Sequence, residues 1–426
     1  MGKKELRWLR LDNAAKIYPA ARRRNWNNMF RISATLCDPI DPVILQQAVE
    51  KVLPRFPSIG VRLRRGLFWY YLEETEQIPA VQQDTWCPLS RMRFSDIRKC
   101  AIRVLYYENR IAVELYHALT DGNGGLIFLK TLVAEYIRQR YGESVPCTDG
   151  VLDCAQHPDP EELEDSFVKY CGNIKASRRE PSAYRIRGLR EADGFLHITT
   201  GILKADAVYE MAHRYGATVT EFLTAAMIMS ILELQKKDHP YRWNRRSVKV
   251  LVPVNLRRLF PSKSLRNFVL FYTTGIDPAL GDYTLEEVVR IVHHQAGLEI
   301  TPKRMQARIT TNVRTEQIAL VKVLPLFIKN IAMKMVYNLV GESKACLTIS
   351  NLGRIQLPEE MHRYVNRCDF VLGAQIQQHN NCAVLTYGNT LYINFTRDIK
   401  EAKLEYMFFK YLRKLGLHIL LESNQR

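Results

Sequence analysis

Apolar residues in the first half of the chain alternate between strand-like and helical spacing. Asp41 and Pro42 provide a helix cap and a first-turn proline, and the apolar residues behind them indicate a helix that ends near Pro54. Two hairpins are expected next, and the second leads directly into His117. The predicted segments are a helix at 41–54, hairpins at 61–72 and 101–116, and a helix at 126–141.

The second half also mixes helices and strands. Thr220 is the expected cap of a strongly apolar helix, and Thr284 with Glu287 forms a capping box for another. Asn389 marks a hairpin turn. We expect helices at 206–215, 221–234, 284–298 and 403–415, and strands at 195–203, 248–254, 347–350, 370–375, 383–387 and 390–395.

The organisation of these segments favours two lobes. A length of 426 residues fits two domains or one bilobal fold. No regular alternation of strand and helix runs through the chain, which disfavours a doubly wound parallel sheet. Residues 142–190 carry little periodicity and suit a connection. We expect an α/β chain of the α+β type, with an N-terminal lobe at 1–175, a connection at 176–194 and a C-terminal lobe at 195–426.

The formal net charge of +17 calls for an anionic partner, such as nucleic acid, a phosphorylated cofactor, an acidic carrier protein or an anionic membrane. No zinc finger, helix-turn-helix or RRM signature accompanies the charge, so nucleic acid is disfavoured. The apolar segment 318–340 is interrupted by three lysines, and it fits either a core helix or a helix on a membrane surface. Basic clusters lie at 22–24, 62–65, 178–179, 245–246 and 257–258.

The nine cysteines are scattered and form no CxxC pair. This pattern disfavours a disulfide framework and a cysteine-based zinc site, and it fits a reducing compartment. The charged start of the chain, residues 1–11, does not resemble a secretory signal. We expect no metal site and a cytoplasmic location, with peripheral membrane contact as an open alternative.

Residues 117–125, His-Ala-Leu-Thr-Asp-Gly-Asn-Gly-Gly, are the best candidate for chemistry. A histidine just beyond a strand end is held rigidly, and its imidazole can take a proton from an alcohol near neutral pH. Asp121 follows four residues later, and Gly122 permits close approaches. A calcium loop would require a carboxylate at position 132, which is Leu132. The Gly-Lys-Ser/Thr ending of a phosphate-binding P-loop is absent. No GxSxG nucleophile elbow exists either, so an α/β-hydrolase is unsupported.

The segment from His117 to Gly122 matches the HxxxDG motif, and the chain resembles the chloramphenicol-acetyltransferase-like superfamily, which includes condensation domains. Tyr116 stands where condensation domains usually carry a first histidine. Three further segments resemble this superfamily, namely Pro253–Arg257 (PVNLR), Arg266–Phe268 (with Arg where Gly is usual) and Ser350–Gly353 (SNLG). The tail at 391–417 resembles the alcohol acetyltransferase branch most closely.

The resemblance implies two α/β lobes with antiparallel-rich mixed sheets and a central tunnel that holds His117. His117 would be the general base of a direct ternary-complex acyl transfer. Asp121 would have a structural role in the active-site loop beside Gly122, paired with Arg257 from the second lobe. Groups that would stabilise the oxyanion or position the acceptor are the backbone amides in 122–125, Asn267, Ser350 and Asn351. Residues that would bind the phosphates of coenzyme A are Arg258 and Lys263.

The predicted activity is an O-acyltransferase of the alcohol acetyltransferase type. The acyl donor would be acyl-CoA, used as a co-substrate, or an acyl carrier protein, and the acceptor a small alcohol or amine. No tightly bound cofactor is expected, and a monomer is reasonable. The alternative is a catalytically inert relative that uses the two-lobed fold for binding or scaffolding.

Overall fold

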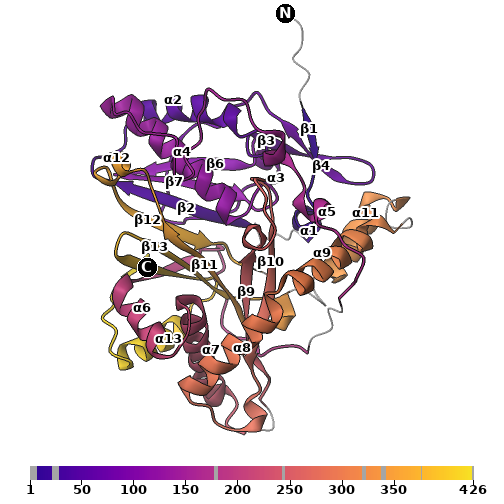
Figure 1. Ribbon diagram of the computed structural model, residues 1–426, viewed down its shortest axis with the longest axis vertical. Helices are drawn as coiled ribbons and strands as arrows, with labels where there is room; N and C mark the ends of the chain where they lie inside the picture. Colours follow the sequence, from indigo (N-terminus) through magenta and orange to yellow (C-terminus); the bar gives the residue numbers. More distant parts are fainter. Residues whose placement is uncertain are drawn as a thin grey trace, which may run out of the picture.

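The computed structural model describes residues 7–21, 28–176, 181–241, 245–318, 323–336, 342–375 and 377–424. Strands in these residues form three sheets with helices packed around them (Figure 1). The basic clusters at 22–24 and 178–179 lie outside the described residues, as do parts of the apolar segment 318–340.

The first lobe, at the top of Figure 1, is built on a five-stranded sheet of order β12-β2-β7-β6-β5 with a small sheet of order β1-β4-β3. Helices α2 and α4 pack on each other, and α4 packs on β2. The elements are β1 (Trp8–Arg10), α1 (Ile17–Ala21), β2 (Met29–Leu36), α2 (Pro42–Val52), η1 (Leu53–Arg55), β3 (Val61–Arg65), β4 (Tyr70–Glu74), β5 (Gln82–Gln83), α3 (Phe94–Ile97), β6 (Ile102–Tyr107), β7 (Arg110–Tyr116), α4 (Gly122–Tyr141), η2 (Pro160–Leu163), α5 (Ser166–Lys169) and β12 (Val365–Leu372).

The second lobe is built on a seven-stranded sheet of order β10-β9-β11-β13-β14-β8-β15. Helix α7 is buried on most of its surface because α8, α13 and β9 pack around it. The elements are β8 (His197–Lys204), α6 (Ala205–Arg214), α7 (Val219–Asp238), β9 (Val248–Asn255), η4 (Leu256–Arg258), β10 (Val269–Ile276), η5 (Pro278–Leu280), α8 (Leu285–Glu299), α9 (Pro302–Gln317), η7 (Glu342–Lys344), β11 (Leu347–Ile355), β13 (Asn380–Tyr387), β14 (Thr390–Arg397), α13 (Lys403–Lys414) and β15 (Leu420–Ser423). Two helices from this half of the chain pack on the first lobe instead: α11 (Leu326–Val336) on α1, and α12 (Glu359–His362) on β12.

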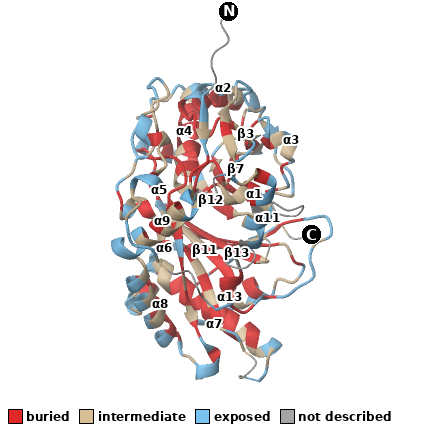
Figure 2. Cartoon of the chain, turned by 90° about the vertical axis from the view of Figure 1, so that its right-hand side faces the viewer, coloured by how far each residue is buried: buried red, intermediate tan, exposed pale blue. Residues whose placement is uncertain are grey.

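Antiparallel pairing dominates the described strands. Parallel pairs occur between β11 and its neighbours β9 and β13, and between β5 and β6. The α/β class with antiparallel-rich mixed sheets is therefore confirmed. Figure 2 colours α4 and the central strands as buried, which places the core between each sheet and its helices.

The predicted division into lobes at 1–175 and 195–426 misses one exchange between them. Strand β12 comes from the second half of the chain but pairs antiparallel with β2 in the first lobe, with Ser33 opposite Asp369. Its buried side chains, such as Phe370, join the apolar core of the first lobe. Local periodicity predicted a strand here, but it cannot indicate which sheet the strand joins.

Two helix starts differ from the prediction. Thr218, and not Thr220, caps α7, because Thr218 and Glu221 form a reciprocal capping box. Helix α4 begins at Gly122 and not at residue 126, since Asp121 caps it by accepting hydrogen bonds from the next turn. The expected glycine loop is thus the first turn of a helix. The capping box at Thr284 and Glu287 is confirmed.

No single helix among the described residues is long and apolar enough to cross a membrane. Helices α6 and α7 meet that test only when taken together, and they are bent by 78° relative to each other. Most of α7 is buried in the second lobe.

The helical glycines Gly124 and Gly297 give opposite predictions. A Cβ at Gly124 would lie 2.3 Å from the carbonyl oxygen of Leu265. We expect Gly124→Ala to destabilise the protein by roughly 1–3 kcal/mol because backbone atoms would have to move. A Cβ at Gly297, in α8, would meet nothing within 4 Å. Gly297→Ala should therefore stabilise by about 0.5–1 kcal/mol. Urea denaturation measures both, and equal effects would contradict the packing argument.

Candidate active site

His117 lies immediately after β7, at the end of the strand that the sequence analysis assigned to it. Its backbone N–H donates to the carbonyl oxygen of Asn28 at 2.8 Å, just before β2. Two adjacent strands of the five-stranded sheet therefore fix the histidine backbone. The residue is half-buried, so its ring is sheltered without being sealed from solvent.

Two aromatic rings hold the imidazole of His117. Tyr18, from α1, stacks on it with ring centroids 4.8 Å apart and an angle of 27° between the planes. Phe30, from β2, meets it edge-on at 5.1 Å. These contacts leave the ring few orientations, so the direction of its two nitrogen atoms is set by the fold.

A polar chain reaches His117 from the other side. The Nδ1 atom of His117 is 3.1 Å from Oδ1 of Asn267. The amide nitrogen of Asn267 donates to Oδ2 of Asp12 at 3.2 Å. Oδ1 of Asp12 accepts from the backbone N–H of Ala15 at 2.7 Å, and the guanidinium of Arg266 lies 3.9 Å from Oδ2. Asp12 and Asn267 are both buried.

This chain fixes the tautomer of His117. Burial raises the pKa of Asp12, while the charge of Arg266 and the hydrogen bonds that Asp12 accepts oppose this shift. When Asp12 is ionised, both of its oxygens accept hydrogen bonds, so the NH₂ group of Asn267 faces it. The amide oxygen of Asn267 then faces His117, and Nδ1 must carry a hydrogen to be bonded there. The lone pair is therefore on Nε2, the atom that a general base would use.

Burial lowers the pKa of His117 below its ordinary value of 6.5 because it penalises the charged imidazolium. The negative charge of Asp121 and the hydrogen bonds to the backbone of His117 and to Asn267 act in the opposite direction but are weaker. The neutral imidazole, which can accept a proton, is therefore favoured at neutral pH.

Asp121 does not contact the imidazole through any described hydrogen bond. Its Oδ1 accepts from the backbone amides of Asn123 and Gly124, both at 3.1 Å. Its Oδ2 accepts from Arg257 at 2.7 Å and from the amide of Phe268 at 2.9 Å. The predicted contact between Asp121 and Arg257 is present in the structure, and it joins the N-terminus of α4 to the segment after β9.

Arg257 is itself held by the backbone of the second lobe. Its guanidinium donates to the carbonyl oxygens of Ser264 and Arg266. All three guanidinium nitrogens of Arg257 therefore donate to groups within the protein. Arg257 is for this reason poorly suited to bind a substrate phosphate.

The glycines after Asp121 allow close packing. A Cβ at Gly122 would lie 2.7 Å from the side chain of Leu352 on β11. The amides expected to stabilise an oxyanion are mostly engaged, because those of Asn123 and Gly124 bond to the Asp121 carboxylate and that of Gly125 to the Asp121 carbonyl. These three amides already have partners within the protein, and their predicted role at an oxyanion stays a prediction.

Other predicted site residues have partners elsewhere in the protein or are exposed. Asn351 donates to Thr220 and accepts from the amide of Gly353. Lys263 pairs with Asp159 at 3.1 Å, while Arg258 is exposed. No described contact joins these residues or Ser350 to His117. Their predicted roles in binding acceptor or phosphate stay predictions.

Asn267 has a different place from the one expected, since it orients His117 and lies on its Nδ1 side. Neither Tyr18 nor Asp12 is among the residues predicted from the sequence. Their segment is a short helix and turn without hydrophobic periodicity, and Asp12 lies far from Asn267 along the chain. Arg266 is the residue from which an acidic partner such as Asp12 could have been predicted, because a buried arginine requires an acidic partner.

A cavity of about 660 Å³ adjoins the N-terminal segment. It is lined on one side by Trp8, Leu11 and Lys16, and on the other by the hairpin of β3 and β4 and the end of α9. Leu11 thus borders the cavity while the next residue, Asp12, takes part in the chain that orients His117. Among the described residues, no group of three or more His, Cys, Asp or Glu side chains could hold a metal ion.

No family model matches the sequence, and no curated protein matches it either. Solved structures match nearly the whole chain. The first condensation domain of the calcium-dependent antibiotic synthetase, in complex with a substrate analogue, has a TM-score of 0.63 at 12% identity and covers 96% of both chains. The trichothecene 15-O-acetyltransferase TRI3 from Fusarium sporotrichioides has a TM-score of 0.60 at 10% identity, covering 95% of this chain and 94% of its own.

A third similar structure is TRI101 of F. sporotrichioides in complex with coenzyme A and T-2. It has a TM-score of 0.61 at 10% identity and covers 98% of this chain and 100% of its own. At these identities the similarity concerns the fold. The chain has the two-lobed fold of condensation domains and chloramphenicol-acetyltransferase-like acyltransferases.

Removing one partner of the Asp121–Arg257 pair should destabilise the protein strongly. We expect Arg257→Leu to cost about 3–5 kcal/mol, because it leaves the buried carboxylate of Asp121 without its cation. The matched control is Arg258→Leu, since Arg258 is exposed next door and should change stability by less than about 0.5 kcal/mol. Urea denaturation of both variants tests this, and similar midpoints would contradict it.

Proposed function

We propose that the protein is an acyltransferase in which His117 is the general base. The observation that supports this most directly is the geometry at His117. Its Nδ1 is engaged by Asn267, its ring is held by Tyr18, and its Nε2 carries the lone pair. The similarity in fold to acetyltransferases and condensation domains supports acyl transfer in general.

The proposed reaction is a direct transfer between two bound substrates. Nε2 of His117 takes the proton of an acceptor hydroxyl as its oxygen attacks the thioester carbonyl carbon. The tetrahedral intermediate collapses with cleavage of the carbon–sulfur bond, and the imidazolium returns the proton to the leaving thiolate. No acyl-enzyme is needed, because the acceptor oxygen forms its bond to the acyl carbon directly.

The polar groups around His117 would orient its imidazole ring and would take no part in proton transfer themselves. Asn267 and Asp12 would keep the Nδ1 hydrogen in place and stabilise the transient imidazolium, while Asp121 and Arg257 would hold the two lobes in register. The donor proposed is acyl-CoA, whose phosphates complement the net charge of +17, with an acyl carrier protein as the other source of a thioester. The acceptor class is an alcohol, with an amine as the variant.

Substitution of His117 tests the proposal. The wild type is incubated with a panel of acyl-CoAs and alcohols, and thiol release is followed. We expect His117→Ala to lower kcat by at least about a hundredfold, since general-base catalysis is worth about 10²–10⁴. The control is His294→Ala, which removes an exposed histidine on α8. Turnover that survives His117→Ala would refute the mechanism, and absence of turnover with any thioester would favour a binding role.

The pH dependence supplies a second test. Because burial lowers the pKa of His117, its neutral form should persist below pH 6.5, and the acid limb of kcat/KM should have an apparent pKa below that value. Burial and the charge of Asp12 raise the pKa of nearby Asp165 to about 6, so Asp165 could mimic this limb.

The variant Asp165→Asn separates the two groups. The acid limb should stay in Asp165→Asn if His117 is the titrating base. A limb that disappears in this variant, or one that lies above pH 6.5 in the wild type, would contradict the assignment to His117.

A further inference from the structure

Helix α11 carries its apolar side outward. Phe327, Ile331 and Met335 follow one another at helical spacing and are 59%, 62% and 58% exposed. The inner side of the helix is the more polar one, with Lys329 and Asn330 turned toward the first lobe. A surface helix of a globular protein usually turns its apolar face toward the protein core and its polar face toward solvent.

Contacts with the first lobe fix this orientation. The ammonium group of Lys329 lies 3.7 Å from the ring centroid of Trp69 and donates to the carbonyl oxygen of Phe68. Asn330 donates to the hydroxyl of Tyr70. The backbone of Leu326 donates to the carbonyl oxygen of Leu67. The outward apolar side is therefore built into the fold and is not a consequence of a loosely attached helix.

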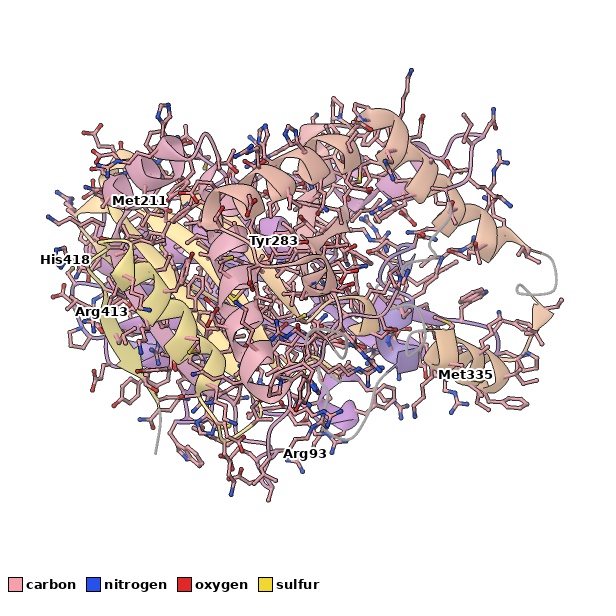
Figure 3. The ribbon with its side chains drawn as sticks, turned by 90° about the horizontal axis from the view of Figure 1, so that it is seen from below. Arg93, Met211, Tyr283, Met335, Arg413 and His418 are labelled. Carbon is pink, nitrogen blue, oxygen red and sulfur yellow. The ribbon has the colours of Figure 1, made fainter. Side chains whose placement is uncertain are left out.

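The turn between β3 and β4 extends the apolar surface. Leu67 and Phe68 are both exposed and lie beside the start of α11. In Figure 3, Met335 marks the outer end of the helix, at the periphery of the molecule. We call this the α11 surface, made of the side chains of Leu67, Phe68, Phe327, Ile328, Ile331 and Met335.

The charge around the α11 surface is positive. Residues 317–341 contain three lysines and no aspartate or glutamate. Lys334 is exposed on α11 itself, and Arg65 is exposed next to Leu67. The nearby Glu73 is neutralised by Arg62 and Arg64, which lie 2.7 and 2.8 Å away. An apolar helix face flanked by cations is complementary to a partner that has an apolar interior and an anionic surface layer.

We propose that the α11 surface docks on an anionic lipid membrane. Phe327, Ile331 and Met335 would insert between the headgroups, and Lys334 and Arg65 would contact lipid phosphates or carboxylates. Such a helix lies in the plane of the interface, and its affinity combines buried apolar area with attraction to anionic lipid.

Two other occupants fit less well. A second copy would bring the same cations face to face across a two-fold axis, and six side chains offer little area for a stable dimer. Nucleic acid would gain nothing from the aliphatic stripe, because phosphates and base edges require polar donors.

The position of the α11 surface connects it with the candidate active site. Helix α11 packs on α1, which supplies Tyr18 to the imidazole of His117. Trp69, which holds Lys329, also lines the cavity of about 660 Å³. A protein seated on its α11 surface would therefore present this cavity close to the lipid.

Flotation of the full chain with vesicles tests the proposal. One set of vesicles is pure phosphatidylcholine, and the other contains roughly one third phosphatidylglycerol. We expect binding to the anionic vesicles that is at least about tenfold tighter than to the neutral ones and that weakens with added salt. The variant Phe327→Ser/Ile331→Ser/Met335→Ser should lower that binding by more than about tenfold, and Lys334→Gln by about fivefold.

The matched control is Leu280→Ser/Leu298→Ser, which changes leucines of the second lobe that are 82% and 66% exposed. It should bind vesicles like the wild type. Circular dichroism and the thermal midpoint should be alike in all variants because every substituted side chain is exposed. Hydrogen exchange of the wild type gives an independent readout, since amides of 326–336 should exchange more slowly with anionic vesicles present.

Equal flotation of the triple variant and the wild type would overturn the proposal. So would binding that ignores lipid charge, or no binding at all. A wild-type dimer that is lost in the triple variant, seen by sedimentation velocity, would assign the surface to a second copy instead. These measurements require no acyl transfer, so their outcome is independent of the proposed catalytic function.

Discussion

The carboxylate of Asp121 is the point on which the arrangement of the site depends. One oxygen caps α4, and the other accepts hydrogen bonds from Arg257 and from the amide of Phe268. Phe268 follows Asn267 directly in the sequence. The hydrogen bond from the backbone amide of Phe268 to Asp121 therefore also places the side chain of Asn267 opposite His117. A single buried carboxylate thus positions the base and its partner while remaining apart from the imidazole.

Three distant parts of the chain meet at the imidazole. The strand end supplies His117, the segment before β10 supplies Asn267, and the N-terminal segment supplies Asp12 and Tyr18. Asp12 and Asn267 are both buried, and each would be costly to bury without its partner. Their mutual satisfaction explains why the N-terminal segment, with little regular structure of its own, is held against the segment before β10 in the second lobe.

Much of this could be predicted where the pattern is local. The strand that ends at His117, the helix behind it and the capping box at Thr284 follow from short-range periodicity. The contact between Asp121 and Arg257 was expected only from a resemblance. The start of α4 was wrong because glycines weaken helical propensity, and the Asp121 cap outweighs that weakness. Tyr18 and Asp12 were missed because their roles arise from contacts with residues far away in the sequence, which no local pattern encodes.

The strand exchange described above bears on how the protein is made. Strand β2 leaves the ribosome long before its neighbour β12, which is synthesised only after most of the second-lobe strands and helices that precede it. Until then one edge of the nascent first lobe offers unpaired backbone groups and uncovered apolar side chains. Pairings between segments so distant in sequence form slowly. The two lobes therefore cannot mature in succession, and the first depends on the arrival of the second to reach its final form.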